Sequence, residues 1–259
     1  MRALLFAAAL CLPASAQIGR GVNFYSPEKE VALGQTLATE FERQGRILDN
    51  ATVEQYISDL GARLVDQLPA DTIAFPYKFR VLVSPSDPGT HEPNAFPGGF
   101  IFVPTSLLLA AQDEGELAGM LAHSIAHIAA RHGTRAETRG QIANQASIPL
   151  IFMGGWPGYG IRQAAQTAVP LGMLTFARGF EMEADKIAVQ LLSGAGLDPS
   201  ALARYIERTQ VDPTSPTFSL FPTRAQRLDR LREAIAKLPA LGGTAPDFRQ
   251  IQELVRGNN

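Results

Sequence analysis

The sequence predicts an α+β fold that is mostly helical and contains a small β-sheet. Amphipathic helical patterns recur along most of the chain, and two short stretches are rich in the aromatic and β-branched residues that strands favour. Of 259 residues, 46% are hydrophobic and 19% are charged, which is typical of a globular chain and excludes a disordered tail. The formal net charge of -2 argues against a nucleic-acid partner.

Residues 1–16 have the layout of a secretory signal peptide. An apolar run over residues 3–12 precedes the small-residue cleavage site at residues 14–16, and the run is too short to span a bilayer. We expect cleavage near Ala16, a periplasmic or secreted location, and a single domain over residues 17–259. Cys11, the only cysteine, would leave with the signal, so the mature chain would have neither thiol nor disulfide chemistry.

Two helices are predicted at the start of the mature chain. Ser26 and Pro27, followed by acidic residues, favour a helix that begins there and runs to about Gln44. A second start at residues 50–54 precedes apolar residues at helical spacing as far as Leu68. We expect both helices to be packing scaffold.

The middle of the chain predicts two strands and then a long series of helices. Residues 77–83 and 99–103 have strand character, and the Pro-, Asp- and Gly-rich residues 84–93 between them predict a loop. A long apolar helix is predicted from Asp113 through His132. Further helical patterns cover residues 135–151, 162–175, 178–192, 199–209 and 223–238.

The apolar stretch 146–161 contains two prolines and four glycines, which argue against a membrane span. We interpret it as a buried helix junction. A mobile flap over a cleft and a contact with the membrane surface are the functional alternatives.

Two of the four histidines are four residues apart in the long apolar helix. This spacing puts His123 and His127 on one helical face, where both imidazoles can bind one tetrahedral metal ion. About fifty residues later, Glu181 and Asp185 are also one helical turn apart. Glu181 can be a third ligand, while Asp185 can accept a hydrogen bond from a ligand imidazole. His132 is off this face, and we expect it to satisfy a buried polar contact.

These motifs resemble the gluzincin-type zinc metallopeptidases, which include the CAAX prenyl protease, HtpX and the periplasmic BepA-like enzymes. The resemblance extends over most of the mature chain and rests on five segments in the right order: residues 26–30, 94–103, the His helix to His132, 178–185 and 195–199. It implies a zincin-like metallopeptidase domain built around an active-site helix and holding one zinc ion. By this resemblance His123, His127 and Glu181 are the zinc ligands and Asp185 supports a ligand imidazole.

The resemblance also implies how a substrate would bind. The strand at residues 99–103 would be the sheet edge that receives an unfolded or extended polypeptide through main-chain hydrogen bonds. The residues involved would be Gly99, Phe100, Ile101 and Phe102. Arg227 matches the arginine that stabilises a developing oxyanion in the family. No transmembrane span is expected, and peripheral membrane contact stays open.

One departure from the family pattern bears on the chemistry. Ser124 stands where the family has the Glu that acts as general base on the metal-bound water. Such acid–base catalysis contributes roughly 10²–10⁴-fold, and a neutral hydroxyl cannot supply it. Metal binding does not need this side chain. Glu183 points to another helical face and Glu116 lies about 10 Å along the helix from His123, so neither is a convincing substitute.

Two functional classes follow from these observations. One is a zinc metalloendopeptidase with impaired hydrolysis, in which Arg227 assists and an unidentified group serves as base. The other is a pseudopeptidase that keeps the peptide groove as a chaperone-like or scaffold binder of unfolded envelope proteins. A metal-free helical binding domain is a third possibility.

Overall fold

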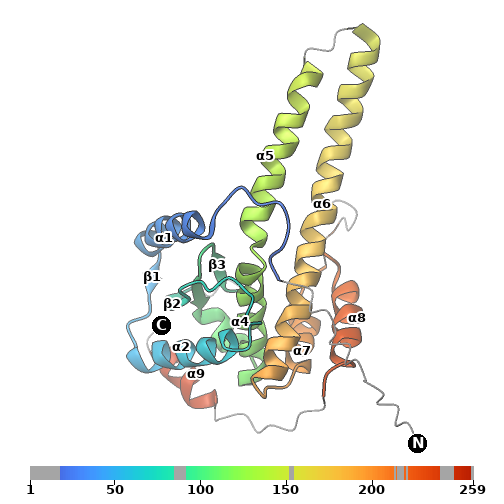
Figure 1. Cartoon of the computed structure of the whole chain (residues 1–259). Coiled ribbons are helices and arrows are strands. Elements are labelled where there is room, and N and C mark those ends of the chain that lie inside the picture. The colour runs from blue at the N-terminus through green and yellow to red at the C-terminus, as the bar shows by residue number, and fades with distance from the viewer. Residues whose placement is uncertain are drawn as a thin grey trace, which may run out of the picture.

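The computed structural model describes residues 18–84, 92–151, 155–212, 214, 219, 221–239 and 248–257, with the backbone alone at 144–174. The expected signal peptide, His91 and the side chains of the stretch 146–161 lie outside the described residues. In the described part, helices surround a small mixed sheet of four strands (Figure 1). The prediction of a mostly helical α+β fold is therefore confirmed.

The helices and strands follow the predicted order, with short elements added between them. They are α1 (Pro27–Gln44), β1 (Arg46–Ile47), α2 (Ala51–Val65), β2 (Lys78–Val83), β3 (Asn94–Phe96), β4 (Phe100–Pro104), α3 (Thr105–Ala110), α4 (Glu114–Ala129), α5 (His132–Ile151), α6 (Gly155–Gly194), α7 (Ser200–Thr209), α8 (Arg224–Ile235) and α9 (Phe248–Gly257). Ser26 caps α1 by accepting a hydrogen bond from the Lys29 amide, and Asn50 caps α2. Polar caps thus set both predicted helix starts.

The sheet has the strand order β1-β2-β4-β3, so β4 is an inner strand. It runs parallel to β2, with Arg80 opposite Phe102, and antiparallel to β3, with Ala95 opposite Ile101. The expectation that residues 99–103 form the sheet edge was wrong. All residues of β4 are buried, and a continuous apolar run is what a strand with neighbours on both sides needs. The edge position belongs to β3.

Helix α1 fixes the position of β3 through the tight turn between β3 and β4. Gly98 in this turn has φ 78°, a left-handed conformation that favours glycine, and its backbone lies against Val31 of α1. Gly34 of α1 packs so closely on the same turn that a Cβ atom there would lie 1.7 Å from the Pro97 carbonyl oxygen. The missing side chains therefore allow a backbone-to-backbone contact that holds the edge strand in place.

Helix α4 forms the centre of the molecule. Fifteen of its sixteen residues are buried, and His127 is the one that is partly exposed. A helix that is buried on all its faces must be enclosed by other elements. Here α2, α6 and α7 pack against it, and β3 lies across it.

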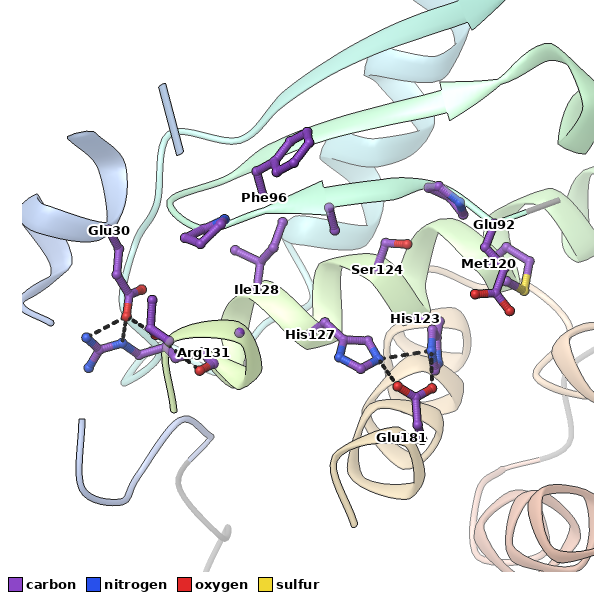
Figure 2. A pocket seen from close by; sticks show the side chains of 15 residues that line it. Glu30, Glu92, Phe96, Met120, His123, Ser124, His127, Ile128, Arg131 and Glu181 are labelled. Atoms are coloured by element: carbon purple, nitrogen blue, oxygen red, sulfur yellow. Dashed lines mark hydrogen bonds and ion pairs between the residues drawn. The ribbon is translucent and has the colours of Figure 1, made fainter. Parts of the chain in front are cut away.

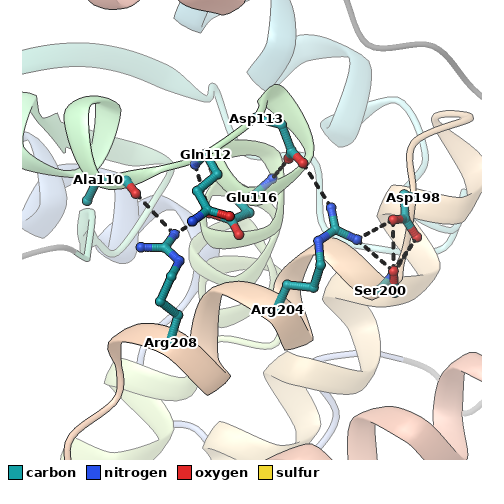
Figure 3. A network of polar contacts seen from close by, with 8 residues as sticks. All are labelled: Ala110, Gln112, Asp113, Glu116, Asp198, Ser200, Arg204 and Arg208. Atoms are coloured by element: carbon teal, nitrogen blue, oxygen red, sulfur yellow. Dashed lines mark hydrogen bonds and ion pairs between the residues drawn. The ribbon is translucent and has the colours of Figure 1, made fainter.

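The amino end of α4 is anchored by charged groups (Figure 3). Asp113 caps the helix, since its side chain accepts a hydrogen bond from the Glu116 amide at 2.8 Å. On α7, Arg204 binds the Asp113 carboxylate at 3.0 Å and Arg208 binds Glu116. Acidic groups at this end also interact favourably with the helix dipole. The start of the histidine-bearing helix is thereby fixed relative to α7.

Two predicted helix boundaries were wrong. The helix predicted to run through His132 ends at Ala129, and α5 begins at His132 after Arg131, whose φ is 59°. The two helices predicted at residues 162–175 and 178–192 are one continuous α6 of 40 residues. In Figure 1, α5 and α6 lie side by side and project from the body of the molecule. None of the helices in the described part combines the length and hydropathy that crossing a bilayer requires.

The close contact at Gly34 leads to a stability prediction. Gly34→Ala should lower the free energy of unfolding by about 1–3 kcal/mol, because the new methyl group would overlap the Pro97 carbonyl and push α1 from the turn. Denaturant unfolding checks this value. Gly140→Ala in α5 is the matched control: a Cβ there meets nothing within 4 Å, so it should be neutral or slightly stabilising. Equal stability of both variants would contradict the proposed packing.

Candidate metal centre

Three potential ligand side chains come together where α6 packs on α4. His123 and His127 of α4 point their Nε2 atoms at each other across 3.0 Å. The Glu181 carboxylate of α6 faces both, with Oε2 3.4 Å from His123 Nε2 and Oε1 3.5 Å from His127 Nε2 (Figure 2). A zinc ion with tetrahedral bonds of about 2.1 Å holds its donors about 3.4 Å apart. The two imidazoles and the carboxylate therefore fit a metal ion.

The charges in this cluster affect one another strongly. Burial lowers the pKa of His123, but its contacts with the Asp185 and Glu181 carboxylates outweigh burial and raise that pKa to about 9. Burial raises the pKa of Glu181, yet the two imidazoles hold it well below the usual carboxyl range. A negative carboxylate and two convergent ring nitrogens favour a cation between them, whether a proton or a metal ion.

The other ring nitrogen of His123 contacts a buried ion pair. Asp185 Oδ1 lies 2.9 Å from His123 Nδ1, and Asp185 is only 1% exposed. The Arg227 guanidinium donates two hydrogen bonds to this carboxylate, at 2.8 and 2.6 Å, and a third to Gln210 Oε1 at 3.1 Å. Burial raises the pKa of Asp185, but the hydrogen bonds from Arg227 and the close His123 imidazole lower it overall. Asp185 therefore stays ionised behind the ligand imidazole.

The other ring nitrogen of His127 contacts a third histidine. His132 Nδ1 lies 3.0 Å from His127 Nδ1, and His132 Nε2 lies 3.2 Å from Glu183 Oε2. Burial lowers the pKa of His132 to about 4, although the hydrogen bond with Glu183 opposes this shift. The hydrogen bond with His132 lowers the pKa of Glu183. A neutral imidazole and an ionised carboxylate thus lie behind His127.

A cavity of about 260 Å³ opens in front of the three potential ligands. Its walls come from α4, from the β3 segment, from α1 and from the start of α5 (Figure 2). The lining residues are Glu30, Glu92, Pro93, Ala95, Phe96, Pro97, Met120, His123, Ser124, His127, Ile128, Arg131, Gly133, Thr134 and Glu181. Ser124 therefore lies on the cavity wall between the metal cluster and the edge strand.

Two carboxylates besides Glu181 line the cavity. Glu30 is 1% exposed and is held by Arg131 Nε at 2.9 Å and by Asn23 at 3.1 Å. Glu92 precedes β3, and Figure 2 shows it at the His123 end of the cavity, beside Met120. Among the described residues, no hydrogen bond or ion pair engages the Glu92 carboxylate. Glu30 is structural in character, whereas Glu92 is available to the cavity.

Comparison with known proteins agrees with this geometry. The family model described as Peptidase family M48 matches residues 52–235, well over half of the chain. The chain belongs to peptidase family M48. Membership makes it a metallopeptidase by family and supports a metal at the His-His-Glu cluster. The resemblance inferred from the sequence motifs is confirmed.

Individual relatives match the chain at modest sequence identity. The beta-barrel assembly-enhancing protease of Escherichia coli (strain K12) is 28% identical over 193 residues, which cover 70% of this chain and 37% of that protein. The same-named protein of Yersinia pestis is 28% identical over 196 residues, covering 71% and 38%. The chain thus matches less than two fifths of the length of these relatives. The crystal structure of S. mikatae Ste24p covers 79% of this chain and 55% of its own, with 18% identity and a TM-score of 0.48.

The structure brings some of the predicted site residues together and places others away from the metal cluster. His123, His127 and Glu181 come together, and Asp185 lies behind His123. Arg227 lies further back than expected, because its guanidinium is turned onto Asp185 and Gln210. This geometry favours a role in positioning Asp185 over the expected contact with an oxyanion. None of the four residues expected to bind substrate, Gly99, Phe100, Ile101 and Phe102, lines the cavity, whereas Ala95 and Phe96 of β3 do.

Several residues at the site have little or no recognisable signal in the sequence. The edge strand β3 is only three residues long, which is too short for a period-2 pattern to be recognised. Glu92 gives no signal because it stands in a loop with no motif. His132 and Glu183 could have been paired from the sequence, since the family pattern includes both segments, but His132 on a continuous helix would face away from His127.

The donor geometry predicts one zinc ion per chain. Purified protein, equilibrated with zinc and dialysed at neutral pH, should retain one equivalent, and its unfolding temperature should rise. His123→Ala and Glu181→Gln should each lose this zinc, because two donors no longer define the site. Metal analysis measures the stoichiometry. Glu137→Gln, at an exposed position of α5, is the control and should retain zinc. Native protein that retains none would favour a metal-free binding domain.

Proposed function

We propose that this chain is a zinc-binding metallopeptidase of the cell envelope whose peptide hydrolysis is impaired because Ser124 occupies the position of the general base. The observation that carries the proposal is the complete His123, His127 and Glu181 donor set beside a serine on the same cavity wall. Residues 17–259 would form one metallopeptidase-like unit, with residues 1–16 as the signal that directs export.

The donor set is of the type that catalytic zinc uses. Two imidazoles and one carboxylate leave a fourth position open, and the cavity in front of them gives that position access to a ligand. Zinc bound there would polarise a substrate carbonyl and acidify a water molecule. The ionised Asp185 holds His123 from behind, and Arg227 in turn holds Asp185. These residues keep the ligands in place whether or not hydrolysis follows.

The edge strand β3 supports an extended polypeptide as the substrate. It pairs with β4 on one side, while no strand of the described sheet pairs with its other side. Ala95 and Phe96 of this strand line the cavity that contains His123 and His127. A polypeptide added to β3 through main-chain hydrogen bonds would therefore pass over the metal cluster. The relatives named beta-barrel assembly-enhancing proteases support unfolded envelope proteins as the polypeptide class.

The structure supports impaired hydrolysis because the two carboxylates weighed as replacements are engaged elsewhere. Glu116 accepts a hydrogen bond from the Gln112 amide at 2.9 Å and binds Arg208, and it does not line the cavity. Glu183 binds His132 from behind the cluster. A site that binds polypeptide and cleaves it slowly would hold its substrate for longer. Ser124 therefore also favours the alternative function, chaperone-like or scaffold binding without cleavage.

Glu92 offers a route for residual hydrolysis. It is the carboxylate on the cavity wall that is neither part of the metal cluster nor paired among the described residues. It lies at the His123 end of the cavity, whose wall also carries the metal cluster (Figure 2). A carboxylate reached through water can act as a general base, although less well than one fixed beside the metal.

Restoring the carboxylate at position 124 tests the proposed function. Zinc-loaded Ser124→Glu should cleave unfolded casein about 10²-fold faster than the native chain or more, because the general base returns to its family position. Ser124→Gln is the matched control: it has nearly the same volume and no base, so its rate should stay at the native level. Zinc content is measured on all three proteins. No gain with zinc fully bound would contradict the assignment of the defect to Ser124.

Replacing Glu92 tests the residual route. We expect the zinc-loaded native chain to show slow cleavage and Glu92→Gln to lower its rate at least 10-fold with unchanged zinc content, because the remaining base is neutralised. The assay uses a quenched fluorescent peptide, and Glu137→Gln serves as the surface control. An unchanged rate in Glu92→Gln would exclude this carboxylate. The absence of any cleavage in the native chain would instead favour the non-catalytic binder.

A further inference from the structure

His132 owes its position behind His127 to a break in the chain between α4 and α5. On a continuous α-helix, a residue five positions after His127 would lie about 140° around the axis and face away from it. Here Arg131 has φ 59°, and this left-handed residue turns the chain so that His132 Nδ1 comes within 3.0 Å of His127 Nδ1. A non-glycine residue in this conformation costs of order 1–3 kcal/mol, so surrounding contacts must hold it.

Those contacts come from the amino-terminal part of the molecule. Glu30 of α1 accepts hydrogen bonds from Arg131 and Thr134, which flank the start of α5. Arg131 also donates to the carbonyl oxygen of Tyr25. Glu30 is 1% exposed and lies 101 residues before Arg131 in the chain. The turn that brings His132 to His127 is thus fixed by a buried cluster.

The direction of the hydrogen bonds behind His127 follows from the metal cluster. Nε2 of His127 faces His123 and Glu181, so its lone pair must be free there and the ring proton belongs on Nδ1. His127 then donates from Nδ1 to His132 Nδ1. His132 must in turn keep its proton on Nε2 and donate it to Glu183 Oε2, 3.2 Å away. Each donor in this series has one acceptor.

The surroundings of His132 keep its ring in this orientation. Phe180 of α6 stacks on the imidazole with a centroid distance of 4.5 Å and an interplanar angle of 21°. Arg135, one turn further along α5, lies 3.6 Å from the Glu183 carboxylate and stacks over Phe180. His132 itself is 3% exposed. The ring can neither turn toward solvent nor leave His127 without losing these contacts.

We propose that His132 is a positioning residue for the metal centre: together with Glu183 it fixes the tautomer and orientation of His127 so that Nε2 faces the metal. The arrangement matches that of His123, whose Nδ1 contacts Asp185 directly, except that an extra imidazole lies between His127 and its carboxylate. Partners of this kind typically change metal affinity by 10–100-fold. The proposal rests on the zinc site proposed above.

The experiment measures the zinc dissociation constant by competition with a chelator, using two replacements of His132. His132→Phe keeps the stacking on Phe180 and removes the acceptor for His127, so zinc affinity should fall 10–100-fold. His132→Asn puts an amide oxygen near the position of Nδ1 and should restore affinity to within a few-fold of the native value. Glu183→Leu, at a partly exposed position, removes the acceptor for His132 Nε2 and should weaken zinc binding several-fold, less than His132→Phe.

Controls separate positioning from folding and from the zinc assignment itself. Circular dichroism and unfolding of each variant without zinc establish that it is folded under the titration conditions, and Glu137→Gln should keep native affinity. If native protein binds zinc and folded His132→Phe binds it equally well, the positioning role is overturned while the proposed function stands. If His132→Phe does not fold, an unchanged affinity in folded Glu183→Leu, which has no acceptor for His132, overturns the role. If native protein binds no zinc, both proposals fail.

Discussion

The close packing of α6 on α4 is the contact on which the metal centre depends. Two histidines one turn apart give only half of a binding site, and the third donor must come from another helix. Both helices carry small side chains in the core, since Ala122 and Ala126 on α4 and Ala184 and Ala188 on α6 are all fully buried. Small residues let two helical backbones approach closely. Glu181 can therefore reach both imidazoles, as the 3.4 and 3.5 Å distances show.

Charge imposes the second constraint. The site buries ionisable groups around one small volume, and removing a charge from water costs several kcal/mol unless it is paired. Each buried group has a partner of complementary character: Asp185 has Arg227, Glu30 has Arg131, and Glu181 has the two imidazoles. A buried ion pair adds little net stability. Its value here is geometric, because it permits one orientation of each ligand ring.

Local signals in the sequence were enough to predict the helices and the residues of the metal cluster. Features that depend on contacts between distant segments could not be predicted from such signals. Polar caps such as Ser26 and Asn50 and the spacing of the histidines act within one or two turns, so they can be read directly. The break after α4 depends instead on Glu30, 101 residues away, and no pattern around Arg131 indicates it. Arg227 was recognised by its motif, but its turn toward Asp185 follows from the packing of α8 on α6.

Ser124 separates two requirements that a peptidase site normally combines. Holding a metal needs convergent donors and buried groups behind them, and this chain retains the whole of that arrangement at the cost of burying several charges. Moving a proton also needs a general base beside the metal, and the family position of that base holds a serine that is 4% exposed. The geometry of the donors does not involve its hydroxyl. The arrangement of the metal-binding donors is therefore physically independent of the residue at position 124.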